Sequence, residues 1–277
     1  MERTPLSTQQ PAPDRRPDVW AAGDAYEPYV GRWSRLVARE FLAWLALGPD
    51  LRWLDVGCGT GALTQTILAQ ASPREVVGID PSEGFVAYAR DRTRDPRAAF
   101  KTADARGLAA ADAGLFDAAV AGLVLNFIPE PAAALTAIAR AVRPGGTVAC
   151  YVWDYAEGMQ LMRAFWDAAM ALDPGAWELD EGRRFPLCRA EPLHALFDQA
   201  GLQRTEVRTI DVPTVFTSFD DYWLPFLGGQ GPAPTYCMAL SEVRRRQLRE
   251  RIRAALPVAP DGSIRLSARA FAVRGVN

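Results

Sequence analysis

The order of hydrophobic and polar positions divides the first half of the chain into short apolar runs separated by amphipathic segments. Short apolar runs between turn residues are typical of buried strands, and apolar positions repeated every three or four residues are typical of helices. Strands that alternate with helices favour an α/β fold with a mainly parallel sheet. The predicted strands are 53–56, 75–80, 98–102, 115–121 and 147–153, and the predicted helices are 33–47, 62–70, 133–142 and one that begins at Pro81 and Ser82.

The second half of the chain departs from this alternation before it returns to it. Residues from about 154 to 190 predict a helical insertion rich in methionine and aromatic side chains, which we interpret as a substrate lid that is also partly core. The run 216–236 holds glycines and prolines and predicts a long loop that forms another wall of the substrate site. Further helices are predicted over 191–201 and 242–255, and an antiparallel pair of edge strands over 203–212 and 262–273.

The N-terminal end of the chain differs in composition from the rest. Residues 1–18 are polar and rich in proline, so we expect a disordered tail there. Residues 19–277 are expected to form a single domain, with a helical arm over 19–48. The aromatic and cationic cluster in this arm is equally compatible with a hydrophobic staple for the first helix and with a segment that folds over a ligand.

The central feature is a glycine-rich bend after the first predicted strand. Gly57, Gly59 and Gly61 follow the apolar strand, and a helix begins at Ala62. Glycine allows sharp turns and close approach of the backbone to a ligand, and the first turn of the helix points free N–H groups at the same place. Asp55 within the strand favours a ligand that is cationic or carries an amine. A tight turn without a ligand, or a nicotinamide-dependent oxidoreductase, also fits the glycine pattern alone.

The run Asp55-Val-Gly-Cys-Gly-Thr-Gly61 resembles the first motif of class I S-adenosylmethionine-dependent methyltransferases, and the likeness extends from about Tyr26 to the C-terminus. The resemblance implies a Rossmann-like, doubly wound, seven-stranded sheet, mostly parallel with an antiparallel last strand. It also implies S-adenosyl-L-methionine as cofactor and S-adenosyl-L-homocysteine as product. The expected reaction is in-line SN2 transfer of a methyl group to a small, apolar or aromatic molecule, the class EC 2.1.1. A protein that binds S-adenosylmethionine without catalysis is the further alternative.

Residue roles follow from this resemblance and from position. Asp80 has the spacing of a ribose-binding carboxylate, Arg32 is expected to bind the methionine carboxylate, and Asp104 with Ala105 to hold the adenine. Asn126 is either a cap or a substrate contact. The expected cofactor residues are Tyr26, Tyr29, Arg32, Asp55, Gly57, Cys58, Gly59, Asp80, Pro81, Ser82, Asp104, Ala105 and Gly122. The expected substrate residues are Trp33, Asn126, Trp153, Trp166 and Trp223, and the candidate catalytic residues are Asp154 and Tyr155.

Composition excludes several other classes. The net charge of −2 and the pI near 5.6 give no basic field for nucleic acid, and we interpret the arginine-rich helix 242–255 as a solvated face. Four scattered cysteines predict neither a metal site nor a disulfide framework.

Without a long apolar run or a signal peptide, the expectation is a cytoplasmic protein with no membrane partner. The single lysine, Lys101, excludes a Tyr-x-x-x-Lys pair, and the single histidine, His194, is expected to be structural. The sequence leaves the oligomeric state open.

Overall fold

The structure is a computed structural model that describes residues 27–108, 113–228 and 231–277. The expected tail over 1–18 and the expected cofactor residue Tyr26 lie outside these ranges.

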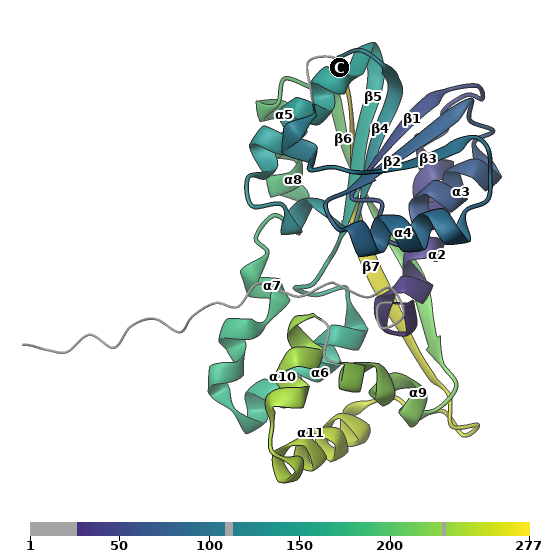
Figure 1. Cartoon of the computed structure of the whole chain (residues 1–277). Coiled ribbons are helices and arrows are strands. Elements are labelled where there is room, and N and C mark those ends of the chain that lie inside the picture. Colours follow the sequence, from purple (N-terminus) through teal and green to yellow (C-terminus); the bar gives the residue numbers. More distant parts are fainter. Residues whose placement is uncertain (1–26, 109–112, 229–230) are drawn as a thin grey trace, which may run out of the picture.

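Within the described residues, seven strands form one sheet in the order β3-β2-β1-β4-β5-β7-β6 (Figure 1). β1, β2, β3, β4 and β5 pair in parallel, and β7 is antiparallel to both β5 and β6. The predicted mostly parallel sheet with an antiparallel last strand is thereby confirmed. The strands are β1 (Arg52–Val56), β2 (Glu75–Asp80), β3 (Ala98–Thr102), β4 (Phe116–Gly122), β5 (Val142–Trp153), β6 (Gln203–Phe216) and β7 (Ile264–Val276).

Helices cover both faces of this sheet. α2, α3 and α4 lie on one side, and α5 and α8 lie on the other (Figure 1). The central strands are therefore buried on both faces, which explains why their sequences are nearly continuous apolar runs rather than alternating ones. The elements are η1 (Glu27–Gly31), α2 (Arg32–Leu45), α3 (Ala62–Gln70), α4 (Glu83–Arg92), η2 (Ala105–Gly107), η4 (Leu125–Phe127), α5 (Pro131–Ala141) and α8 (Ala190–Gln199).

β6 and β7 extend beyond the rest of the sheet. β5 pairs with β7 only from Ala270 to Val276, so residues 211–216 and 264–269 form a two-stranded ribbon of their own. A second group of helices, which we call the lid, lies beside this ribbon (Figure 1). The lid comprises α6 (Gln160–Leu172), η5 (Pro174–Leu179), α7 (Glu181–Arg184), α9 (Phe219–Trp223), η6 (Leu224–Gly228), α10 (Pro232–Ala239) and α11 (Glu242–Ala255).

The prediction of a long loop over residues 216–236 is wrong, because the described part of this segment is largely helical. The Ser218 hydroxyl accepts a hydrogen bond from the Asp221 N–H and caps α9. Gly231 has φ +83° and precedes Pro232 in the first turn of α10, where proline favours helix initiation. Glycine and proline therefore mark helix boundaries here rather than an extended loop.

The bounds of the arginine-rich helix α11 are as predicted, and most of its arginines are exposed, as expected of a solvated face. Arg245 donates hydrogen bonds to backbone carbonyls that include those of Cys237 and Leu240 at the end of α10. Arg249 forms an ion pair with Asp220 of α9 at 2.9 Å. Several arginines of α11 thus hold the lid helices together. None of the described helices is both long and apolar enough to cross a membrane.

Candidate functional site

A cavity of about 250 Å³ lies at the carboxyl ends of β1, β2, β4 and β5. Ligands of open α/β sheets bind at this edge because helices start there and loops converge there. Its walls come from the glycine bend, the ends of the strands, the arm and the lid. The residues that line it are Val30, Ser34, Asp55, Gly57, Cys58, Gly59, Thr60, Ala62, Leu63, Asp80, Pro81, Ser82, Phe85, Gly122, Leu123, Val124, Phe127, Tyr151, Trp153, Tyr155 and Met162.

The glycine bend needs glycine for two separate reasons. Gly57 and Gly59 have φ values of +66° and +50°, which side chains other than glycine adopt only with strain. A Cβ on Gly57 would also lie 2.4 Å from a methyl carbon of Val124. A Cβ on Gly59 would meet no atom closer than 4.0 Å, so the backbone of Gly59 lies open at the cavity.

Asp55 places a buried carboxylate at the inner end of the cavity. Its side chain is buried, and Oδ2 accepts a hydrogen bond of 2.6 Å from the Thr64 hydroxyl of α3. Oδ1 has no hydrogen-bond partner in the described part of the chain. Burial raises the pKa of Asp55 to about 7, against the lowering effect of its hydrogen bonds with Thr64. Oδ1 can therefore accept a hydrogen bond from a cationic group. The positive charge of that group would stabilise the ionised form of Asp55.

Asp80 lies at the end of β2, beside the glycine bend. One carboxylate oxygen accepts from the Gly59 N–H at 3.0 Å and the other from the Ser82 N–H at 2.9 Å. Burial raises the pKa of Asp80, and the two backbone donors act in the opposite direction. Each oxygen retains a free lone-pair direction, so the carboxylate can still accept hydrogen bonds from a pair of ligand hydroxyls.

We name the part of the wall formed by Val30, Ser34, Trp153, Tyr155 and Met162 the outer end of the cavity; apart from the hydroxyls of Ser34 and Tyr155, its side chains are apolar or aromatic. Val30 and Ser34 contribute from the arm, and Trp153, Tyr155 and Met162 contribute from the end of β5 and from the lid. Water is poorly accommodated among such side chains, so a reacting group bound there is held in a dry environment.

Ten of the predicted site residues line this cavity: Asp55, Gly57, Cys58, Gly59, Asp80, Pro81, Ser82, Gly122, Trp153 and Tyr155. The described residues that were predicted for the site but are absent from its walls are Tyr29, Arg32, Trp33, Asp104, Ala105, Asn126, Asp154, Trp166 and Trp223.

Two of the predicted charged contacts have other partners. Arg32 forms an ion pair of 2.8 Å with Asp221 of α9, and its guanidinium lies over the rings of Trp33 and Phe216. Asp104 follows β3 at the correct edge of the sheet, but its carboxylate forms an ion pair of 2.6 Å with Arg106. That hydrogen bond with Arg106 lowers the pKa of Asp104. Neither residue lines the cavity, and their assignments to the cofactor stay predictions.

The predicted tryptophan contacts are mostly core residues. Trp166 is fully buried in α6 and donates its indole N–H to Glu181. Trp223 is buried and stacks on Phe219 within the lid, and Trp33 packs edge-on against Phe216 at 5.4 Å. Of the predicted substrate tryptophans, Trp153 alone lines the cavity.

The other predicted residues that lie outside the walls have structural surroundings. Asp154 is buried and accepts a hydrogen bond from the Glu157 N–H, which fixes the turn after β5. Ala105 is buried at the start of η2. The Asn126 amide caps no described helix, and its buried nitrogen and oxygen have no partners among the described residues. His194, expected to be structural, lies in α8 with its Nδ1 3.0 Å from Asp198.

Several lining residues escaped the sequence reasoning. Val124 and Phe127 follow β4 in a segment where only the polar Asn126 drew attention, although apolar side chains at a strand end are ordinary wall residues. Val30 and Ser34 are four residues apart, so they lie on one face of the arm. This spacing could have indicated which face of the arm lines the cavity. Tyr29 and Trp33, which were predicted instead, lie on a different face.

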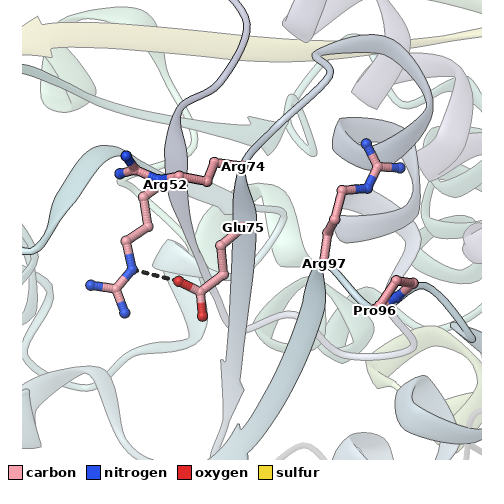
Figure 2. Close-up of a pocket in the computed structure, with 5 residues that line it drawn as sticks. All are labelled: Arg52, Arg74, Glu75, Pro96 and Arg97. Carbon is pink, nitrogen blue, oxygen red and sulfur yellow. Dashed lines mark hydrogen bonds and ion pairs between the residues drawn. The ribbon is translucent and has the colours of Figure 1, made fainter.

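A second, more open hollow of about 550 Å³ lies at the opposite edge of the sheet, where β1, β2 and β3 begin (Figure 2). Arg52, Arg74, Glu75, Pro96 and Arg97 line it. Its arginines are already paired: Arg52 with Glu75 at 2.6 Å, as Figure 2 shows, and Arg97 with Asp95 at 2.7 Å. The hollow therefore lacks a free cationic group and lies away from the carboxyl edge.

Known proteins share both the sequence of the central region and the fold. Residues 54–150 match the family described as a methyltransferase domain. Trans-aconitate 2-methyltransferase of Methylobacterium nodulans is 34% identical over 120 residues, 43% of this chain and 45% of that protein. Ubiquinone biosynthesis O-methyltransferase of Methylococcus capsulatus is 37% identical over 97 residues, 34% of this chain and 40% of that protein. The chain thus spans about half or less of the curated relatives it matches.

Two solved structures extend the likeness to most of the fold. A putative methyltransferase of Bacillus halodurans has a TM-score of 0.57 at 13% identity, covering 86% of this chain and 97% of its own. Phosphoethanolamine N-methyltransferase 2 of Haemonchus contortus has a TM-score of 0.56 at 17% identity, covering 91% of this chain and 56% of its own. The sheet order and the glycine bend define the class I methyltransferase fold. Residues 54–150 thus resemble a methyltransferase domain, and the fold around them is that of the class I S-adenosylmethionine-dependent methyltransferases.

Proposed function

We propose that this protein transfers a methyl group from S-adenosyl-L-methionine to a small molecule bound at the outer end of the cavity. The observation that carries the proposal is the unpartnered Oδ1 of buried Asp55, which lies in one cavity with Asp80 and the glycine bend. A buried carboxylate without a partner is costly, and an ammonium group relieves that cost. The methionine part of the cofactor carries such a group.

The residues of the cavity fit this cofactor in distinct ways. Asp55 would hold the ammonium group, and Asp80 would accept from the ribose hydroxyls. The open backbone at Gly59 lets the ligand approach closely. Arg32 does not line the cavity, so this set omits it, although its Nε and Nη2 have no hydrogen-bond partner among the described residues.

The bound cofactor supplies a methyl group that is already activated by the positive sulfur. The work left to the protein is alignment, which accounts for about 7–11 kcal/mol of barrier in well-oriented reactions. Trp153, Tyr155 and Met162 line the outer end, where they would orient the acceptor and exclude water. Tyr155 stays the candidate for hydrogen bonding to the acceptor, whereas Asp154 is held by its own turn.

The acceptor is proposed to be a small molecule. Trans-aconitate 2-methyltransferase and ubiquinone biosynthesis O-methyltransferase are named for small substrates, which supports this class. The cavity volume of about 250 Å³ is compatible with an acceptor group of small size. The family match ends at residue 150, before the lid begins, so the relatives do not identify the acceptor.

Isothermal titration with S-adenosyl-L-homocysteine tests the proposed cofactor. We expect saturable one-to-one binding by the wild-type chain and no heat from NADH under the same conditions. The Asp80→Asn variant should bind more weakly, because an amide accepts from only one of its two terminal atoms. Absence of binding by the wild type, or binding of NADH in preference, would overturn the proposed function.

A further inference from the structure

A cluster of buried polar and aromatic side chains lies where the arm meets the lid, behind the outer end of the cavity. Met162 of α6 lines the cavity, and Trp166 follows one helical turn later on the same face. Val30 lines the cavity from the arm and directly follows Tyr29. Two walls of the cavity therefore continue into this cluster.

Glu181 at the start of α7 is the charged member of the cluster. Its exposed fraction is only 2%. A Cβ added to the neighbouring Gly182 would lie 3.1 Å from the carbonyl oxygen of Tyr155, so this turn packs against the cavity-lining segment. One oxygen of Glu181 accepts a hydrogen bond from the Trp166 indole. The other oxygen, Oε1, has no hydrogen-bond partner among the residues described.

Tyr29 approaches the same place from the arm. Its hydroxyl is buried and likewise has no partner within the described ranges. Burial, and next the Glu181 carboxylate, raise the pKa of the Tyr29 hydroxyl well above its usual value, so the two groups lie within electrostatic reach. The Tyr29 ring meets Phe226 edge-on at 5.5 Å, Phe226 stacks on Phe165 at 4.6 Å, and Phe165 meets Trp166 at 5.2 Å. Aromatic rings thus connect the two polar groups.

The charge of Glu181 has no ion-pair partner among the residues that the structure describes. Arg163 is engaged by Asp180 in a bidentate contact at about 2.8–3.0 Å. None of the ion pairs between described residues includes Glu181, and Arg184 offsets its charge only weakly. A buried carboxylate ordinarily has a cationic partner, and aromatic faces attract cations. A protonated amine is the ligand group that satisfies both conditions.

We propose that Glu181 and Tyr29 form a subsite for a protonated amine carried by the methyl acceptor. This inference rests on the proposed methyl transfer in the adjacent cavity. The ammonium group donates one hydrogen bond to Glu181 Oε1 and another to the Tyr29 oxygen, and the surrounding rings contact the apolar part of the acceptor. Met162 lines the cavity one helical turn before Trp166, and its flexible side chain is the one that we propose moves to admit the ligand.

Three small probes of similar shape test the proposed amine. 2-Phenylethylamine, 2-phenylethanol and 3-phenylpropionate are titrated into the full chain saturated with S-adenosyl-L-homocysteine. We expect the amine to bind more tightly than either of the others by about tenfold or more. Glu181→Gln should remove this preference and leave the affinity for S-adenosyl-L-homocysteine unchanged. Tyr29→Phe should reduce the preference without abolishing it.

Glu178→Gln is the matched control, because Glu178 is an exposed carboxylate of the same lid segment. It should keep the amine preference of the wild type. The proposed subsite is overturned if the wild type binds the amine no more tightly than the alcohol, including the case in which neither binds. It is also overturned if Glu181→Gln keeps the preference. Failure to bind S-adenosyl-L-homocysteine would instead reject the proposed function, so the two failures are distinguishable.

Discussion

At the scale of single residues, Asp55 combines a cost in stability with a role in binding. Burial raises its pKa to about 7, whereas the ordinary value is 3.8. Because each pKa unit corresponds to about 1.4 kcal/mol, the ionised carboxylate in the folded chain costs on the order of 4 kcal/mol. The Thr64 hydroxyl offsets part of the burial cost, and the ammonium group of a ligand is positioned to offset more.

We predict that affinity for S-adenosyl-L-homocysteine depends on the ionisation of Asp55. Below about pH 7 the carboxyl is protonated and must lose its proton to bind an ammonium group, so the affinity should fall by up to about tenfold per pH unit. Titration calorimetry across this range measures the effect. Asp55→Asn should bind weakly at every pH. A wild-type affinity that is flat from about pH 5 to pH 8 would contradict the assignment.

Individual site residues could be predicted from the sequence where a short stretch of chain fixes their position in the cavity. Asp55 and Asp80 follow from strand ends beside the glycine bend, and both line the cavity. Arg32 and Asp104 do not line the cavity, and their cofactor roles stay predictions. The ion pair of Arg32 could not be foreseen from the sequence, because Asp221 is 189 residues away. The ion pair of Asp104 is local, since Arg106 lies two residues further on.

At the scale of elements, the glycine bend tolerates no side chain at Gly57 without strain. Gly57→Ala would force a methyl group to within 2.4 Å of Val124 and would place alanine at φ +66°. The left-handed conformation costs about 1–2 kcal/mol, and overpacking adds about 1–3 kcal/mol. We therefore predict a loss of several kcal/mol in the free energy of unfolding, measured by urea denaturation, together with loss of cofactor binding.

Gly107→Ala provides the control for this substitution. Nothing lies within 4 Å of a Cβ at Gly107, and its φ is outside the left-handed region. Its effect on unfolding should stay within about 0.5 kcal/mol. In the double variant Gly57→Ala/Val124→Ala only the steric part of the loss should return. Equal unfolding energies for Gly57→Ala and Gly107→Ala would show that the bend is not constrained in this way.

The arm is held to the lid by the ion pair between Arg32 and Asp221. Their side chains are 31% and 26% exposed, so the pair is only partly screened by solvent, and the guanidinium also contacts two rings. A double-mutant cycle with Arg32→Ala and Asp221→Ala should give a coupling energy of about 1 kcal/mol in denaturant unfolding.

The pair Arg246–Glu242 serves as the reference for this cycle, because both side chains are largely exposed at 70% and 84%. Its coupling should be smaller, at most about 0.5 kcal/mol. If both cycles gave the same coupling, the Arg32–Asp221 contact would be an ordinary surface pair without a role in positioning the arm.

Helices and strands were predicted best where burial gives the apolar residues a clear spacing along the chain. The five parallel strands and the helices between them follow from apolar runs and capping signals, as in the Ser82 cap of α4. The segment 216–236 was predicted as a loop because short helices carry little periodicity. Its glycines and prolines lie at helix boundaries, and its aromatic side chains pack into the lid, a tertiary effect that no local pattern encodes.

At the scale of the whole molecule, buried acids set the dependence of stability on pH. Burial raises the pKa of Glu181 to about 7, as it does for Asp55, above ordinary values of 4.5 and 3.8. Between about pH 4 and pH 7 the folded chain therefore holds more protons than the unfolded chain, so stability falls as pH rises through this window. Above about pH 7 this contribution is fully lost.

We predict that Asp55→Asn and Glu181→Gln each stabilise the ligand-free chain relative to wild type at about pH 8 and much less at about pH 5. The gain should be up to several kcal/mol, because the neutral amide avoids burying a charge. Denaturant unfolding at several pH values measures it. Variants that are destabilised equally at both pH values would show that these carboxylates are not ionised at a cost in the native state.

The ribbon of β6 and β7 limits how the protein can exchange its ligands. β5 leads into α6, β6 leads into α9, and the chain returns from α11 through β7, so three strands anchor the lid to the sheet. A rigid-body swing of the lid would have to bend both strands of this ribbon together at the point where it leaves the sheet, near Ile210 and Ala270. Turnover is therefore expected to depend on small openings at Val30 and Met162. Slow amide hydrogen exchange throughout the ribbon, with and without ligand, would be its signature.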